Sequence, residues 1–326
     1  MSAPAHPLES APPRAAKSGK ETLVEVFREL PSYWEDDETT SISLARTQDT
    51  TTGARDRGVL VRLDAAGAGR PLPLCSKPCQ MGRHVNADYR LDDEGISRFH
   101  AKLFAAHDAH WIEDLESRNG TYVNGARVKL RALVDGDTIQ LGARVAFRYS
   151  RVDAAQQRAM LQLYESSIRD PLTGAYNRSH LEERLTEEVS FARRHRTTLS
   201  VILLDVDHFK VVNDRHGHQV GDSVLLRLSE TVSHMLRTED VFARYGGEEF
   251  LVLLRGVGHP GAAQAAERIR EALARPHPST PSITVSLGVA SLSCVSPQTA
   301  AALVSAADRR LYQAKHRGRN LVVARG

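Results

Sequence analysis

The stretch 241-VFARYGGEEFLVLL-254 places two apolar segments on either side of a pair of glycines. Short apolar segments joined by a glycine turn predict two strands that form a hairpin. Glycines at the tip let the backbone approach a ligand closely, because they carry no side chain. Glu248 and Glu249 follow, and adjacent carboxylates repel each other unless a metal ion or a substrate cation relieves them. This stretch therefore predicts a hairpin whose tip binds a cation.

The segments around the hairpin alternate between helix and strand patterns. The apolar stretch 199–207 predicts a strand, and Asp205 near its end needs a cation or a turn if it is buried. Further strands are expected at 282–291 and 320–324. Helices are expected near 178–195, 220–236, 260–274 and 298–317. The alternation predicts an α+β domain, a central sheet flanked by helices, with room for a ligand at the strand ends.

Polar and basic side chains near these strands suggest nucleotide chemistry. Lys315 and Arg319 lie four residues apart near the end of the last expected helix, where they would share a face and hold phosphates. The alternative is a solvated helix face. Asn213 and Asp222 have side chains that can pair with the edges of guanine, and the alternative for them is turn and capping chemistry.

Residues 58–150 follow a different pattern, with short strands separated by Gly, Asp and Asn turns, and predict an all-β sandwich. Residues 152–169 predict a helix that stops at Asp170-Pro171, either a dimerising stalk or a linker helix packed on a neighbour. Residues 1–57 are expected to be mostly disordered. Within them, the apolar run 22–34 is expected either to dock as a short helix or to act as a binding peptide.

Composition narrows the class of protein. The chain has 326 residues, enough for two domains with extensions, and its 41% hydrophobic and 25% charged residues are ordinary for a globular protein. A net charge of +3 gives no support for nucleic-acid or membrane partners. No apolar run approaches the roughly 18 residues of a membrane span, and the N-terminus lacks a signal-peptide core, so a cytoplasmic location is expected. Cys75 and Cys79 have no second pair and are expected to be reduced structural thiols.

Five motifs occur in order in the C-terminal half: DPLTGAYNR at 170–178, DVDHFKVVNDRHGHQVGD at 205–222, RYGGEEF at 244–250, TVSLGVA at 284–290 and ADRRLYQAKHRGRN at 307–320. Together they resemble the GGDEF-domain family of diguanylate cyclases, whose sheet is nucleotidyl-cyclase-like. The signature holds Glu248 where the family name has Asp, which preserves the charge. The resemblance implies that two GTP molecules are condensed into cyclic di-GMP and pyrophosphate. Because one domain binds one GTP, it also implies a homodimer during catalysis.

The resemblance also implies roles for individual residues. Asp205, the Val206 carbonyl and Glu248 would bind Mg²⁺, with Mn²⁺ as the alternative. Glu248 or Glu249 would help to deprotonate the attacking 3′-hydroxyl, and the sequence does not decide between them. Lys210 would neutralise developing phosphate charge. The expected substrate-binding residues are Phe209, Asn213, His218, Asp222, Lys315 and Arg319.

Arg237 and Asp240 lie just before the hairpin. Because they are three residues apart, they could form a surface ion pair that stabilises the fold by roughly a few tenths of a kcal/mol. The family resemblance instead implies that this RxxD pattern is an inhibitory site for the product, cyclic di-GMP.

A second set of motifs lies in the β-rich half: Gly82-Arg83, Ser97-Arg98-Phe99-His100, Ser117-Arg118-Asn119-Gly120-Thr121 and Asn124-Gly125. Arginine forks with neutral Ser and Asn donors suit a phosphate dianion. In this order the motifs resemble the forkhead-associated (FHA) domain, a β-sandwich that binds phosphothreonine peptides. The resemblance implies mainly architectural roles for Gly82, His100 and Gly120. It implies that the residues facing the phosphothreonine are Arg83, Ser97, Arg98, Arg118 and Asn119.

The sequence therefore predicts a tail at 1–57, an FHA domain at 58–150, a helical linker at 151–170 and a GGDEF domain at 171–326. The predicted function is that of a diguanylate cyclase regulated by phosphothreonine binding and by its product. The phosphothreonine would belong to another protein or to the chain's own tail, although threonines are also common by chance in such tails. The candidate tail residues are Thr39, Thr40, Thr47, Thr50, Thr51 and Thr52. The alternatives are a catalytically silent GTP or cyclic di-GMP receptor and a cyclase that makes a different nucleotide.

Overall fold

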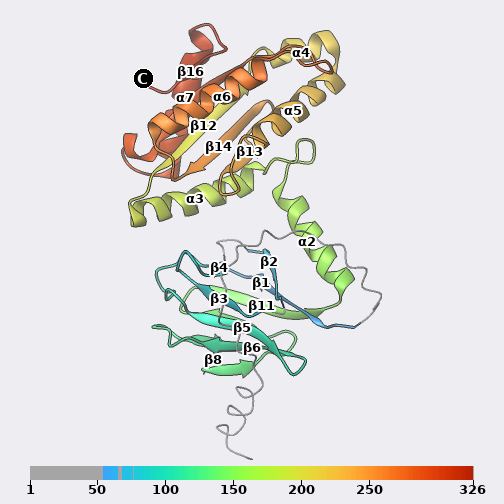
Figure 1. Cartoon of the computed structure of the whole chain (residues 1–326), viewed down its shortest axis with the longest axis vertical. Coiled ribbons are helices and arrows are strands. Elements are labelled where there is room, and N and C mark those ends of the chain that lie inside the picture. Colours follow the sequence, from blue (N-terminus) through green and yellow to red (C-terminus); the bar gives the residue numbers. More distant parts are fainter. Residues whose placement is uncertain (1–53, 65–67, 76, 326) are drawn as a thin grey trace, which may run out of the picture. The chain divides into compact units, whose positions relative to one another are not determined.

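The computed structural model describes residues 54–64, 68–75 and 77–325 (Figure 1). The apolar run 22–34 and the six tail threonines lie outside the described residues. Two regions follow each other along the chain, a β-rich one and one in which helices and strands alternate. The predicted fold class, an all-β sandwich followed by an α+β domain, is therefore confirmed.

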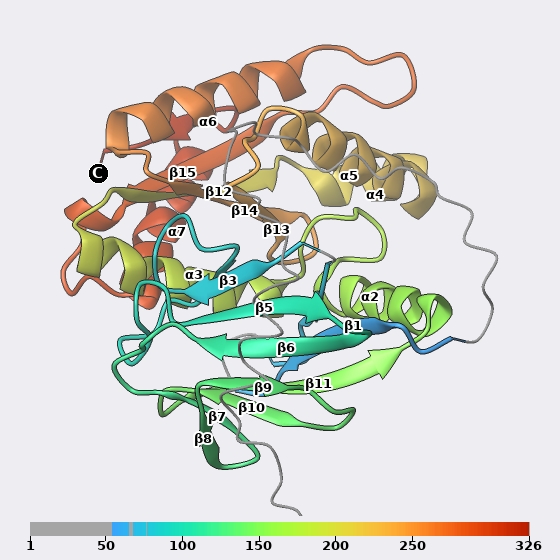
Figure 2. The same ribbon diagram turned by 60° about the horizontal axis from the view of Figure 1, so that its bottom comes forward.

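The β-rich region contains two sheets that face each other (Figure 2). Their strand orders are β2-β1-β11-β10-β7-β8 and β4-β3-β5-β6-β9. Leu60, Ile112 and Phe147 are fully buried in the core between them. The strands are β1 (Arg57–Arg62), β2 (Pro71–Pro73), β3 (Cys79–Gly82), β4 (Tyr89–Arg90), β5 (Ala101–Ala106), β6 (Ala109–Asp114), β7 (Thr121–Val123), β8 (Ala126–Val128), β9 (Leu130–Ala132), β10 (Thr138–Leu141) and β11 (Val145–Val152).

The sequence pattern missed five of the short strands, β2, β3, β4, β8 and β9. Each has two to four residues, too few to show an alternation of apolar and polar side chains. Each of them pairs with a neighbouring strand of the same sheet, which supplies its hydrogen-bonding partners.

Helix α2 (Ala154–Ile168) follows the sandwich, close to the predicted bounds of 152–169. Asp153 caps it by accepting a hydrogen bond from the Gln156 N–H, and the Gln156 side chain bonds back to the Asp153 N–H. This capping box satisfies two backbone donors that a helix start leaves unpaired.

The C-terminal region has one five-stranded sheet of order β13-β14-β12-β15-β16 (Figure 1). All eight residues of β12 (Leu199–Val206) are buried, which explains why the segment is continuously apolar rather than alternating. Helices α3 and α7 contribute to the core on one face of the sheet, and α5 and α6 contribute to the core on the other. The remaining elements are α3 (Arg178–His195), α4 (Phe209–His216), α5 (His218–Ser233), β13 (Val241–Arg244), β14 (Glu249–Arg255), α6 (His259–Ala274), β15 (Val285–Ser291), the 3-10 turn η1 (Leu292–Cys294), α7 (Ala300–His316) and β16 (Val322–Val323).

One helix prediction needs correction. A single helix was expected near 220–236, but α5 begins at His218 and a separate helix, α4, precedes it. Gly217 separates the two helices with φ +84°, a backbone conformation that favours glycine. The polar composition of 207–214 hid α4, because it forms as a cap over the end of the sheet rather than as an apolar stripe.

Within the described residues, no helix is both long and apolar enough to cross a membrane. The cysteines Cys75, Cys79 and Cys294 are free thiols, as expected.

A histidine inside the sandwich makes its stability depend on pH. His100 is fully buried, and its Nδ1 accepts a hydrogen bond from the Ser97 N–H at 3.1 Å. Its Nε2 lies 3.1 Å from the Gly120 carbonyl, so the neutral tautomer protonated on Nε2 satisfies both contacts. Burial lowers the pKa of His100 below its ordinary value of 6.5. A second proton would therefore break the bond to Ser97.

We expect the free energy of unfolding to fall when the pH is lowered from about 7.5 to about 5.5. The pKa of His100 is lowered in the folded state, so the unfolded chain takes up the proton first. The stabilisation is thus complete above 6.5 and is lost as the pH falls below it. Urea unfolding followed by Trp111 fluorescence, with Trp34→Phe as background, measures the drop. His100→Asn should reduce it, whereas replacement of the exposed His316 should not. An equal drop in the His100→Asn variant would contradict the assignment.

Candidate functional site

A pocket of about 340 Å³ lies where α4, the start of α5 and the hairpin tip meet. Its lining includes six residues that the sequence analysis singled out: Phe209, Lys210, Asn213, His218, Asp222 and Glu248. The sequence analysis did not assign four other lining residues to the site: Asp214, Leu225, Arg244 and Gly247. Side chains up to 39 residues apart in the chain are thus gathered around one hollow.

Arg244 holds the hairpin tip in place. Its Nε and Nη2 donate to the Gly247 carbonyl at 3.0 and 2.7 Å, and its Nη1 lies 3.1 Å from both carboxylate oxygens of Asp170. Burial alone would raise the pKa of Asp170, but hydrogen bonds from Thr173 and Arg244 outweigh burial and lower it. The two residues are 74 positions apart, so sequence spacing gave no sign that they meet. Their only signal was membership of two of the recognised motifs.

Gly247 keeps the pocket open on the hairpin side. A Cβ placed on Gly247 would meet nothing within 4 Å, and no unusual φ requires glycine there. The absence of a side chain is therefore not needed for folding of the hairpin. It leaves space at the pocket wall, where a phosphate can approach the backbone.

Three carboxylates gather beside the pocket. The register of β12 and β14 places Asp205 opposite Glu249, and the Val206 N–H donates to the Glu248 carbonyl at 3.4 Å. Burial raises the pKa of Asp205 to about 6, and although the contact with Lys315 opposes this rise, Glu248 and Glu249 add to it. Lys315 therefore does not balance the negative charge of the three carboxylates, and a bound cation would do so.

The donor set fits a magnesium ion shared with a substrate. Asp205 and Glu248 offer carboxylate oxygens and Val206 a backbone carbonyl, the hard ligands that Mg²⁺ prefers. In the part of the chain that the structure describes, no group of three or more His, Cys, Asp or Glu side chains could hold a metal ion. Mg²⁺ is commonly bound by one or two carboxylates together with substrate phosphates and water, so a closed protein cage is not required.

Asn213 offers an unused acceptor in the same region. Its Oδ1 is buried and has no hydrogen-bond partner among the described residues. A Cβ on Gly221 would lie 1.9 Å from this oxygen, so glycine at 221 is what allows the Asn213 side chain to occupy its place. A buried acceptor without a donor is unfavourable until a ligand supplies one. Guanine carries N–H donors on the edge that such a group would read.

Lys315 and Arg319 do not share a helix face, so that expectation was wrong. Helix α7 ends at His316, and Arg319 lies beyond it in a turn where Gly318, Arg319 and Asn320 all have positive φ. Lys315 remains on the helix and places its Nζ 2.7 Å from Asp205 Oδ2. The Arg319 side chain is exposed and forms no ion pair with any described residue.

The alternative interpretation of Arg237 and Asp240, a surface ion pair between them, does not match the structure. The Arg237 guanidinium approaches Glu239 at 3.9 Å, while Asp240 Oδ2 accepts the backbone N–H of Arg237 at 3.1 Å. Asp240 Oδ1 is buried with no hydrogen-bond partner of good geometry among the described residues, and burial raises the pKa of this carboxyl group, although the backbone N–H groups of Arg237 and Arg255 oppose the rise. An exposed arginine thus stands next to a poorly satisfied carboxylate, which suits a ligand that offers both phosphate and N–H groups.

The loops of the sandwich bring together the residues that are predicted to bind phosphothreonine. The Arg83 N–H donates to the Ser97 carbonyl at 2.9 Å, the Arg118 N–H donates to Ser97 Oγ at 3.0 Å, and Asn119 donates to the Gly95 carbonyl at 2.8 Å. The side chains of Arg98, Arg118 and Asn119 are exposed.

Two neighbouring residues have structural roles in these loops. A Cβ on Gly82 would lie 2.1 Å from the Arg98 carbonyl oxygen, so only glycine permits this close approach of the loops. His100 joins the Ser97 and Gly120 segments through its two ring nitrogens. The loops therefore have a fixed base beneath exposed cationic and amide groups.

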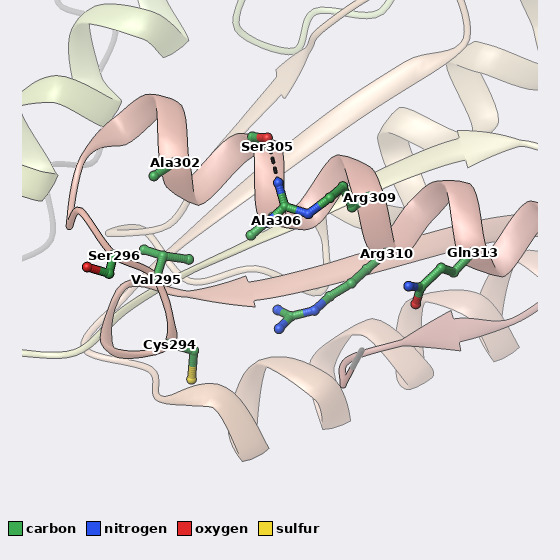
Figure 3. Close-up of a pocket in the computed structure, with 9 residues that line it drawn as sticks. All are labelled: Cys294, Val295, Ser296, Ala302, Ser305, Ala306, Arg309, Arg310 and Gln313. Carbon is green, nitrogen blue, oxygen red and sulfur yellow. Dashed lines mark hydrogen bonds between the residues drawn. The ribbon is translucent and has the colours of Figure 1, made fainter.

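A larger hollow of about 470 Å³ lies elsewhere on the same domain, along α7 and the segment after β15 (Figure 3). Its polar lining includes Arg309, Arg310 and Gln313. Arg310 donates to the Val289 carbonyl at 2.6 Å, and Arg309 donates to Ser305 Oγ at 2.9 Å. The lining contains no carboxylate and none of the residues predicted from the sequence, so it lacks the metal-binding chemistry of the hairpin pocket.

Comparison with known proteins agrees with this geometry. Residues 167–321 match the family model described as "Diguanylate cyclase, GGDEF domain", and residues 79–142 match the FHA domain model. The probable diguanylate cyclase DgcC of Escherichia coli is 39% identical over 171 residues, covering 51% of this chain and 45% of the relative. The diguanylate cyclase DgcP of Pseudomonas aeruginosa is 37% identical over 226 residues, covering 67% and 31%.

Among solved structures, the coiled coil and GGDEF domain of DgcB from Caulobacter crescentus, in complex with c-di-GMP, is 28% identical with a TM-score of 0.48. The match covers 52% of this chain and 91% of that chain. The chain spans less than half the length of the two curated relatives described above. On the family matches and the motifs that carry them, this chain contains a forkhead-associated domain followed by a GGDEF domain of the diguanylate cyclase type.

Proposed function

We propose that this chain is a diguanylate cyclase that condenses two GTP molecules into cyclic di-GMP and releases pyrophosphate. The observation that carries the proposal is the hairpin pocket. It combines the unpartnered Asn213 Oδ1, an acceptor suited to the N–H groups of guanine, with the carboxylate of Glu248 and the cationic side chain of Lys210. The buried carboxylate of Asp205 stands beside it on β12. One pocket thus contains groups for the base, the phosphates and a metal ion.

Each residue acts on a defined part of the nucleotide. Asn213 and Asp222 pair with guanine, with His218 lining the same pocket, and Phe209 lies beside the triphosphate. Lys210 stabilises negative charge that develops at the α-phosphate, and Lys315 and Arg319 bind the β- and γ-phosphates. Asp205, the Val206 carbonyl and Glu248 would hold Mg²⁺, or Mn²⁺ in its place, which lowers the charge barrier to attack when it is bound.

The reaction is a phosphoryl transfer that occurs twice. The 3′-oxygen of one GTP attacks the α-phosphorus of the other, the bond to the β-phosphate oxygen breaks, and pyrophosphate leaves. The proton of the hydroxyl passes to Glu248 or Glu249. Two hairpin pockets must face each other, because each pocket provides the site for one nucleotide. A homodimer is therefore required, and the alignment of its two halves supplies much of the rate. The cytoplasm, where GTP and Mg²⁺ are available, is the proposed location.

Incubation with GTP and Mg²⁺, followed by chromatographic identification of the nucleotides, tests the proposed activity. The wild-type chain should produce cyclic di-GMP, and Glu248→Ala should reduce turnover about 100-fold or more, because it removes a proposed metal ligand. Glu271→Ala, an exposed carboxylate on α6, is the control and should retain full activity. A wild-type chain that binds GTP but forms no cyclic di-GMP, even after bound product is stripped, is instead a receptor. Formation of another cyclic nucleotide would likewise overturn the proposal.

Inhibition by the product is the second part of the proposal. It is supported by the exposed Arg237 beside the poorly satisfied carboxylate of Asp240. Cyclic di-GMP offers phosphates to the arginine and guanine N–H groups to the carboxylate, so one ligand fits both.

Arg237→Ala should weaken inhibition by added cyclic di-GMP about tenfold, while the initial rate without product stays unchanged. Initial rates measured over a series of product concentrations give the inhibition constant. Arg193→Ala, which removes an exposed arginine from α3, is the matched control and should be inhibited like the wild type. An unchanged inhibition constant for Arg237→Ala would exclude this site.

Regulation by phosphothreonine is the third part. Its support is the cluster of exposed Arg98, Arg118 and Asn119 on loops fixed by Ser97 and His100. A phosphopeptide bound there, from the tail or from another protein, would change how often two GGDEF domains meet.

Synthetic peptides covering residues 36–54, each phosphorylated at one threonine, test this part. At least one should bind the chain, and Arg98→Ala should weaken that binding about tenfold, since it removes a charge-assisted contact. Arg131→Ala on β9 is the control. Binding that does not depend on the phosphate would contradict the proposal. Binding only of phosphothreonine peptides from other proteins would place the partner outside the chain.

A further inference from the structure

Asp207, two residues after Asp205, has a carboxylate that accepts three hydrogen bonds from the protein. It is 6% exposed, and its Oδ1 accepts a hydrogen bond from Ser286 Oγ at 2.6 Å. Its Oδ2 accepts from Thr284 Oγ1 at 2.7 Å and from the backbone N–H of Asn320 at 2.9 Å. Its own N–H donates to the Thr284 carbonyl at 2.9 Å. These bonds join the end of β12, the start of β15 and the turn that follows α7.

Asp207 therefore differs from Asp205, although the two are neighbours in one motif. Asp205 has one cationic partner and a raised pKa, which leaves it suited to a metal ion. Asp207 already accepts three hydrogen bonds in a buried setting, so its contacts serve the protein rather than a ligand.

The turn that Asp207 contacts has an unfavourable backbone conformation. Gly318, Arg319 and Asn320 have φ values of +114°, +62° and +45°, and the last two are not glycines. Asparagine tolerates such values, whereas an arginine adopts them mainly where surrounding contacts hold it. Without its contacts, the turn would relax and the direction of the Arg319 side chain would change.

Few contacts hold this turn. The Arg319 N–H donates to the Ala314 carbonyl at 3.0 Å, and Arg270 Nη1 donates to Asn320 Oδ1 at 2.8 Å. The Asn320 N–H has Asp207 as its acceptor. Of these three, only the contact with Asp207 ties the backbone of the turn to the motif that carries the proposed metal ligand Asp205. Together with the bond from the Leu287 N–H to the Leu321 carbonyl at 2.9 Å, which ties the residue after the turn to β15, it holds the turn relative to the proposed metal ligands.

We propose that Asp207 is a positioning residue, which holds the left-handed turn 318–320 so that Arg319 faces the β- and γ-phosphates of bound GTP. The inference rests on the proposed function, because it takes Arg319 as a phosphate ligand. It assigns to Asp207 no contact with the nucleotide or the metal ion. Its effect passes entirely through the backbone of the turn.

A double-mutant cycle on Asp207 and Arg319 tests the proposal. The ligands are α,β-methylene GTP, which cannot release pyrophosphate, and GMP, which lacks the β- and γ-phosphates. Binding of each in the presence of Mg²⁺ is measured by calorimetry. Arg319→Ala and Asp207→Ala should each lower the affinity for the GTP analogue about tenfold and leave that for GMP nearly unchanged. In the Arg319→Ala background, Asp207→Ala should have no further effect, because the side chain that it positions is already absent.

Three other variants separate positioning from general damage. Asp207→Asn should keep most of the affinity, because its amide oxygen can accept from Thr284 and Asn320 while its amide donates to Ser286. Ser291→Ala removes another buried hydrogen bond of β15, to Ser200 at 2.6 Å, and should lower stability without changing the ratio of GTP-analogue to GMP affinity. If Asp207→Ala does not fold, Asp207→Ser replaces it, because serine keeps a polar group near Thr284 and Ser286 but is too short to reach the Asn320 N–H.

Additive losses in the double variant, or an equal loss for GMP, would overturn the positioning role. No effect of Arg319→Ala combined with a loss in Asp207→Ala would overturn it as well. Failure of the proposed function is distinguishable: a chain that follows the expected cycle but makes no cyclic di-GMP from GTP contradicts the cyclase activity and supports the role of Asp207.

Discussion

The burial of β12 is the constraint on which the C-terminal domain depends. Helices cover both faces of the sheet, so β12 is buried along its whole length. The carboxylates at and just beyond its end, Asp205 and Asp207, are therefore buried as well. A buried carboxylate is unfavourable unless it is paired or hydrogen-bonded. Lys315 from α7 meets Asp205, and donors from Thr284, Ser286 and Asn320 meet Asp207. The contacts that make burial tolerable are thus the ones that bring α7, β15 and the turn after α7 to the end of β12.

Some of the poorly satisfied buried groups lie at the proposed ligand sites, whereas others, such as His180 Nδ1 and Arg90 Nε, lie outside them. The pKa of Asp205 stays raised despite Lys315, and the buried oxygens Asn213 Oδ1 and Asp240 Oδ1 have no hydrogen-bond partner of good geometry among the described residues. Asp207 shows the opposite behaviour, because its carboxylate accepts three hydrogen bonds. The contrast supports the proposal that Asp205 binds a ligand and that Asp207, in the same short motif, holds the geometry. Buried polar groups in folded proteins are normally paired, so each exception requires a reason.

In the FHA domain, buried neutral groups hold the loops in place. His100 is held uncharged by burial and connects two loops through its ring nitrogens, while Gly82 allows a third segment to approach. Above this base, arginine and asparagine side chains remain exposed. Function on such domains is commonly carried by loops that a rigid scaffold positions. The scaffold here is a sandwich whose short strands each pair with a neighbouring strand of the same sheet.

The sequence alone determined the class of both domains, the approximate bounds of the long helices and strands, and the residue types of both sites. These follow from local patterns, because periodicity, glycine turns and ordered motifs are properties of short segments. Sequence patterns missed the split between α4 and α5, the left-handed turn that carries Arg319 beyond α7 and the contact between Arg244 and Asp170. Each of these depends on what a segment packs against; Arg244 and Asp170, for example, are 74 residues apart in the chain. Only the tertiary structure decided that Asp205 and Asp207 differ, because two aspartates of one short motif meet different donors in the folded chain.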